Sequence, residues 1–90
     1  MIDYDENEKL HETLIITQEE CAEVIQVISK IMRFGLDEND HRLESEVGDL
    51  LCMVDLLMEQ NIIDPYKLEI AKHAKRNKLK KWSNILEPDS

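Results

Sequence analysis

Residues 16–27 have the sequence Ile-Thr-Gln-Glu-Glu-Cys-Ala-Glu-Val-Ile-Gln-Val. Four of these residues follow the helical spacing i, i+4, i+7, i+11, namely Ile16, Glu20, Glu23 and Val27. On an α-helix these four positions lie within roughly 60° of one another. Aliphatic residues therefore bracket two carboxylates on one face of a predicted helix.

Residues 42–53 repeat this arrangement with Arg42, Glu46, Asp49 and Met53. A short polar turn separates the two helices, so we expect them to pack antiparallel and to bring four carboxylates to one seam. Two carboxylates ~5 Å apart repel by about 3 kcal/mol at an effective dielectric constant of 20. A proton or a cation must offset this repulsion, and carboxylate oxygens are hard ligands that suit Mg²⁺ or Mn²⁺.

Three helices account for nearly the whole chain, and no segment shows the alternation of a strand. We expect the first from about residue 6 or 12 to residue 34, with Gly35 at its C-terminal end. The second is expected over residues 41–60. Asp64 followed by Pro65 predicts the N-cap and first residue of a third helix that ends near Lys81.

We therefore predict one all-α domain over residues 1–90, with a frayed N-terminus and a frayed tail at 83–90. The main apolar stripe of the first helix is Leu14, Cys21, Ile25, Ile28 and Met32. Met32 is expected to fill the core, and Trp82 to close its hydrophobic end.

Length and composition narrow the possible functions. The chain has 90 residues and a net charge of −9, which argues against a general nucleic-acid binder because such a protein needs a cationic surface. No apolar run is long enough to span a membrane, and the first residues are acidic, unlike a secretory signal.

Cys21 and Cys52 lack zinc-site spacing, so we expect reduced thiols in a cytoplasmic protein. A core this small is marginal, and a metal or a partner subunit is expected to support it.

The third predicted helix carries a line of bases. Lys72, Arg76 and Lys80 follow the spacing i, i+4, i+8, which suits phosphate oxygens, and Asn77 could also reach a ligand. Taken alone, these bases fit better with a structural role at the negative end of the helix dipole. Beside a carboxylate–metal cluster, however, they predict a phosphate clamp.

Other interpretations of the acids stay open. An acid pair at i, i+3 is commonly a solvated face, and residues 17–20 also fit a capping box in which Glu20 is a structural residue. A non-enzymatic alternative is an acidic helical module that binds a basic partner or mimics nucleic acid by charge. A third is a di-iron bundle, drawn from the E-x-x-H pairs at residues 8–11 and 38–41.

Two motifs together resemble a known family. Glu-Glu-Cys-Ala-Glu at 19–23, followed after 22 residues by Glu-Val-Gly-Asp at 46–49, is similar to the E-E-x-x-E … E-x-x-D signature of the MazG-like, all-α nucleoside triphosphate pyrophosphohydrolases. Lys72 and Arg76 are similar to the downstream basic pair of that family. The resemblance covers roughly residues 12–82.

The resemblance implies Mg²⁺-dependent cleavage of an NTP or dNTP between its α and β phosphates, giving the monophosphate and pyrophosphate. It implies that Glu20, Glu23, Glu46 and Asp49 hold the metal. Glu19 would either support the metal ligands from outside the metal's own shell or help to orient the attacking water, and Lys72 and Arg76 would hold phosphates. Family members form four-helix bundles as homo-dimers or homo-tetramers, so the resemblance also implies a second copy of the chain as a partner.

Overall fold

The computed structural model describes residues 5–87, which form three α-helices and no strand. The helices are α1 (Glu6–Phe34), α2 (Arg42–Glu59) and α3 (Pro65–Trp82). The all-α prediction is confirmed, and the first helix takes the longer of its two expected ranges. Residues 1–4 and 88–90, part of the ends expected to fray, lie outside the described residues.

Local hydrogen bonds explain where α1 begins and ends. The Asp5 carboxylate accepts the Glu8 N–H at 2.8 Å, which caps the first turn. Gly35 adopts a φ of 88°, a conformation that glycine takes without strain, and its N–H donates to the Ile31 carbonyl at 2.8 Å. Thr17 is in mid-helix, where its hydroxyl donates to the Thr13 carbonyl. The capping-box interpretation of residues 17–20 is therefore wrong, because α1 starts eleven residues earlier.

The connection between α2 and α3 also follows from its residues. Asn61 takes a left-handed φ of 61°, which asparagine tolerates better than most residues, and α2 ends just before it. The Asp64 side chain then accepts the N–H groups of Tyr66 and Lys67, while Pro65 occupies the first helical position. The predicted start of the third helix is confirmed.

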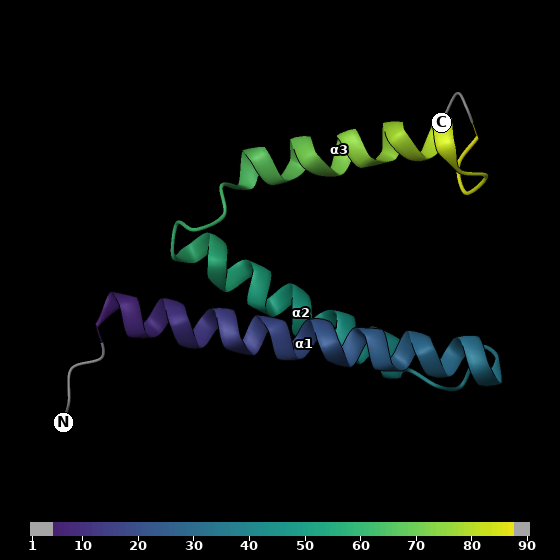
Figure 1. Cartoon of the computed structure of the whole chain (residues 1–90), viewed down its shortest axis with the longest axis horizontal. Coiled ribbons are helices and arrows are strands. Elements are labelled where there is room, and N and C mark those ends of the chain that lie inside the picture. The colour runs from purple at the N-terminus through teal and green to yellow at the C-terminus, as the bar shows by residue number, and fades with distance from the viewer. Residues whose placement is uncertain (1–4, 88–90) are drawn as a thin grey trace.

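α1 and α2 pack side by side as an antiparallel hairpin (Figure 1). Its buried residues are Val27 from α1, Met53 and Leu57 from α2, and Thr13 near the open end of the hairpin. The Gln60 side-chain amide donates to the Thr13 hydroxyl at 3.0 Å, a bond that joins the start of α1 to the end of α2. Apolar packing and this one polar contact fix the relative position of the two helices.

The face of α1 that contacts α2 is not the main apolar stripe. α2 packs on the neighbouring stripe that contains Glu20 and Val27, and Leu14, Ile25 and Ile28 of the main stripe are exposed. Met32 is 82% exposed, so the prediction that it fills the core is wrong for the single chain. Within one copy, α2 can cover only one side of α1, and the carboxylate-bearing side is the one covered.

α3 diverges from the hairpin along most of its length (Figure 1). None of its residues is buried, and Trp82 is 84% exposed, contrary to the prediction that it closes the core. The radius of gyration is 16.8 Å, whereas a compact domain of this length would have about 12 Å. No helix among the described residues is long and apolar enough to cross a membrane.

The Thr13–Gln60 bond makes a stability prediction. Thr13→Val removes the acceptor and leaves a partly buried amide without its partner, so the free energy of unfolding should fall by about 1 kcal/mol. Thr17→Val is the matched control, because the Thr17 hydroxyl only donates to a carbonyl four residues back. Thermal unfolding followed by circular dichroism should give a lower midpoint for Thr13→Val than for Thr17→Val. Equal midpoints would contradict a stabilising role for the bond.

Candidate functional site

Three carboxylates from the two packed helices form a close group. Glu20 comes from the middle of α1, and Glu46 and Asp49 come from α2. One oxygen from each residue lies within 4.8 Å of the others. Glu20 and Glu46 are half-buried, whereas Asp49 is exposed, so the group is partly shielded by the seam and open on one side.

The helical spacing predicted from the sequence explains how this group forms. Val27 lies two turns from Glu20 on the same face of α1, and Met53 lies two turns from Glu46 on the same face of α2. Both aliphatic residues are buried in the contact between the helices. Their packing therefore carries Glu20 and Glu46 into the seam, and Asp49 follows at its edge.

The surroundings disfavour the ionised form of Glu20. Partial burial raises the pKa of its carboxyl first, and the negative charges of Asp49 and Glu46 raise it further. Glu23 and Glu19 add smaller contributions in the same direction. A proton on Glu20 or a bound cation would relieve this repulsion.

The donor set fits a hard divalent cation. Carboxylate oxygens are the ligands that Mg²⁺ prefers, usually with water and phosphate oxygens completing its shell. Among residues 5–87, this is the one group of three or more Asp, Glu, His or Cys side chains close enough to share an ion. The pairs behind the di-iron alternative do not assemble, and the His41 ring instead lies 3.3 Å from Glu44.

The other two predicted acids on α1 lie outside the close group. Glu23 and Glu19 are both exposed. Their positions on the helix turn them toward the open edge of the seam rather than into it. Three of the four expected metal ligands thus come together in the single chain, and Glu23 is next to them.

The predicted phosphate clamp is not brought to the carboxylates of its own chain. Lys72, Arg76 and Asn77 are exposed on α3, and Lys80 is half-buried near its C-terminus. Lys72 donates to Glu69 on its own helix at 3.1 Å. α3 lies apart from the hairpin at these positions (Figure 1).

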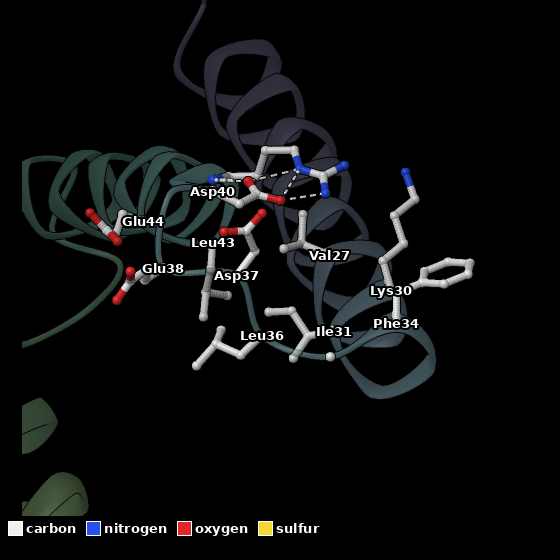
Figure 2. Close-up of a pocket in the computed structure, with 12 residues that line it drawn as sticks. Val27, Lys30, Ile31, Phe34, Leu36, Asp37, Glu38, Asp40, Leu43 and Glu44 are labelled. Atoms are coloured by element: carbon white, nitrogen blue, oxygen red, sulfur yellow. Dashed lines mark hydrogen bonds and ion pairs between the residues drawn. The ribbon is translucent and has the colours of Figure 1, made fainter.

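A cavity at the turn of the hairpin was not predicted from the sequence. It has a volume of about 490 Å³ and is lined by the end of α1, the turn 35–41 and the start of α2. Arg42 lies on its wall, where the guanidinium donates to both carboxylate oxygens of Asp40 (Figure 2). These hydrogen bonds lower the pKa of the Asp40 carboxyl to about 2. The sequence feature that could have indicated this cavity is Arg42, which lies one turn before Glu46 on the same face of α2.

The comparisons with known proteins agree with the geometry. Residues 8–82 match the family model described as the MazG nucleotide pyrophosphohydrolase domain. No curated protein and no solved structure matches the chain at a significant level.

The repulsion at Glu20 predicts how stability depends on pH. Because the pKa of Glu20 is raised, the folded state favours the protonated form, and this advantage is lost as the pH rises through the raised pKa. In EDTA at pH 7.5, Glu20→Gln should therefore melt a few degrees above the wild type. The difference should shrink as the pH falls below the ordinary value of 4.5.

Asp55→Asn is the control for this measurement, because Asp55 is exposed on α2 and lies outside the close group. It should leave the melting temperature nearly unchanged. Added Mg²⁺ should then stabilise the wild type more than Glu20→Gln. A Glu20→Gln variant that melts below the wild type in EDTA would show that Glu20 is not under repulsion.

Proposed function

Because the chain belongs to the MazG nucleotide pyrophosphohydrolase family, we propose that it hydrolyses a nucleoside triphosphate between the α and β phosphates. The products would be the nucleoside monophosphate and pyrophosphate. The observation that carries the proposal is the group formed by Glu20, Glu46 and Asp49, with one oxygen from each within 4.8 Å. These residues would hold Mg²⁺, with Mn²⁺ as a substitute.

The chain's own residues have distinct roles in this reaction. Glu20, Glu46 and Asp49 hold the ion, and Glu23 completes the set from the open edge of the seam. When bound, the ion supplies charge to the phosphate oxygens and makes water more acidic. Glu19 orients the attacking water and accepts its proton. Water adds its oxygen to one of the two phosphorus atoms that the α–β bridging oxygen joins. The bond between that phosphorus and the bridging oxygen breaks, and the bridging oxygen leaves with the other phosphorus.

Half-burial of the acids favours this enzyme over the acidic binding module. A surface that mimics nucleic acid by charge needs its acids exposed to the partner. Glu20 and Glu46 are instead half-buried between two helices. The repulsion between their carboxylates would not help a docking surface to bind a partner.

A second copy of the chain is proposed to complete the protein. The accessible surface of the single chain is 7770 Å², whereas a compact monomer of this mass would expose about 5,500 Å². The excess of about 2,300 Å² per chain is within the range that an obligate homodimer interface covers. The exposed apolar stripe of α1 supplies a surface of the matching character.

In this assembly α3 would also contact a second copy of the chain. It has no buried residue in its own chain. We place its line of bases, Lys72, Arg76 and Lys80, together with Asn77, against the phosphates bound at the seam of a second copy. Cations there would offset the charge on the departing pyrophosphate.

Hydrolysis of a panel of NTPs and dNTPs tests the reaction. With Mg²⁺ or Mn²⁺ the wild type should release pyrophosphate, and EDTA should abolish turnover. Glu20→Gln and Asp49→Asn should each lower kcat/KM by at least about 100-fold, because a metal ligand is lost. Asp55→Asn, outside the close group, should retain activity. Release of single phosphates, or full activity of both variants, would contradict the proposal.

Light scattering coupled to size exclusion tests the assembly. Ile28→Glu places a charge in the exposed apolar stripe of α1, where Ile28 is 45% exposed, and should shift the protein from dimer or tetramer toward monomer. Gln26→Glu adds the same charge on the polar side of α1 and should leave the mass unchanged. A monomeric wild type at micromolar concentration would contradict the proposed partner.

A further inference from the structure

The cavity at the turn of the hairpin has no part in the reaction as described so far. Val27, Ile31, Leu36 and Leu43 provide its apolar surface, and Figure 2 shows Ile31, Leu36 and Leu43 below the carboxylates of Asp37 and Asp40, with Val27 to one side. Its volume of about 490 Å³ is within the range of small-molecule sites. An apolar surface with a few charged groups at its edge is the usual form of such a site.

The cavity lies next along the two helices to the seam that holds the three carboxylates. Glu20 and Val27 share a face of α1, and the rise per residue places them about 10 Å apart along that helix. Arg42 lies one turn, about 6 Å, before Glu46 on α2. One elongated ligand can therefore contact the carboxylates and the cavity together.

Two cations line the cavity, one from each helix of the hairpin. The Arg42 Nε donates to the Asp40 oxygens at 3.0 and 2.9 Å, which fixes the guanidinium in place. A guanidinium has five N–H donors, more than Asp40 can accept. Lys30 lines the cavity from α1 and shares a face of that helix with Glu23, two turns earlier. The wall of the cavity thus combines two cations with apolar side chains, and it begins two turns from Glu20 on α1 and one turn from Glu46 on α2.

We propose that this cavity binds the nucleoside part of the substrate, with Lys30 and Arg42 contacting the sugar–phosphate. This assignment rests on the proposed function, because it takes the phosphates to be held at Glu20, Glu46 and Asp49. A nucleotide whose phosphates lie at the carboxylates would extend its sugar and base along the hairpin toward the cavity. The base would lie against aliphatic side chains from both helices and from the turn.

The cavity wall also selects a class of base. Asp37, Glu38 and Glu44 line the cavity, and ionised carboxylates only accept hydrogen bonds. Asp37 is fixed by the Asn39 N–H, which donates to its Oδ1 at 2.9 Å. Cytosine, adenine and guanine carry an amino group that can donate to such oxygens, whereas uracil carries an oxygen at the equivalent position of cytosine. Bases with an exocyclic amino group are therefore the preferred ligands.

Monophosphates allow binding to be measured without turnover. The full chain, labelled with ¹⁵N, is titrated with dCMP and, separately, with dUMP, which differ at the amino group. We expect amide shifts confined to residues 27–44 and about tenfold tighter binding of dCMP. Shifts centred on α3, or no saturable shifts with either nucleotide, would overturn the site. Equal affinity for the two would overturn the proposed preference for amino-bearing bases.

Variants test whether the cavity itself is the site. Leu36 is 78% exposed on the cavity edge, so Leu36→Trp can fill the space without disturbing the core. It should weaken dCMP binding by about tenfold or more, whereas Ile85→Trp, beyond α3, should not. Lys30→Ala should weaken binding relative to Lys75→Ala, an exposed lysine on α3. Unchanged affinity in both cavity variants would overturn the proposal.

The hydrolysis assay separates this proposal from the function on which it rests. Suppose that no triphosphate releases pyrophosphate, while dCMP still shifts the cavity amides and Leu36→Trp abolishes those shifts. The proposed reaction is then contradicted and the proposed binding site is supported. If the wild type releases pyrophosphate while Leu36→Trp leaves both KM and dCMP affinity unchanged, the reaction remains and the cavity is not its nucleoside site.

Discussion

Glu20 and Glu46 meet across the seam between α1 and α2, so the hairpin is built around a repulsion that only a proton or a cation can offset. Amphipathic helices ordinarily pack through their most apolar stripe. α1 instead turns its carboxylate-bearing stripe toward α2, and the apolar residues buried between the two helices are Val27, Met53 and Leu57. This seam therefore buries less apolar surface than the main stripe would, and it holds carboxylate oxygens close together. Such a loss of stability is typical of functional sites.

This packing also divides the hairpin into two sides. On a helical wheel, the apolar stripes of the antiparallel helices turn toward one side, and Asp49, Glu23, Lys30 and Arg42 turn toward the other. In the proposed assembly, a second copy of the chain would cover the apolar side while the proposed substrate approaches the charged side. The proposed assembly and the proposed ligand site would therefore not compete for the same surface.

The sequence predicts those features that depend on neighbours along the chain. Helical spacing and the capping residues Gly35, Asp64 and Pro65 predict the three helices, and the repeated spacing on α1 and α2 identifies Glu20, Glu46 and Asp49. The sequence also predicts that the carboxylate-bearing stripe of α1 faces α2, but not that the more apolar neighbouring stripe with Met32 stays exposed, because one copy of α2 covers only one side of α1.

The remaining differences arise from tertiary structure. Lys72, Arg76 and Lys80 have the spacing of a clamp, but spacing along α3 does not determine its distance from another helix. The cavity depends on how the turn folds back over Val27 and Ile31, which no periodicity encodes. α3 itself has 18 residues and none of them is buried, and isolated helices of such length are marginal in water. Its amide hydrogens would therefore exchange rapidly in a solitary chain and would become protected in the proposed assembly, so hydrogen exchange in α3 would report on quaternary structure.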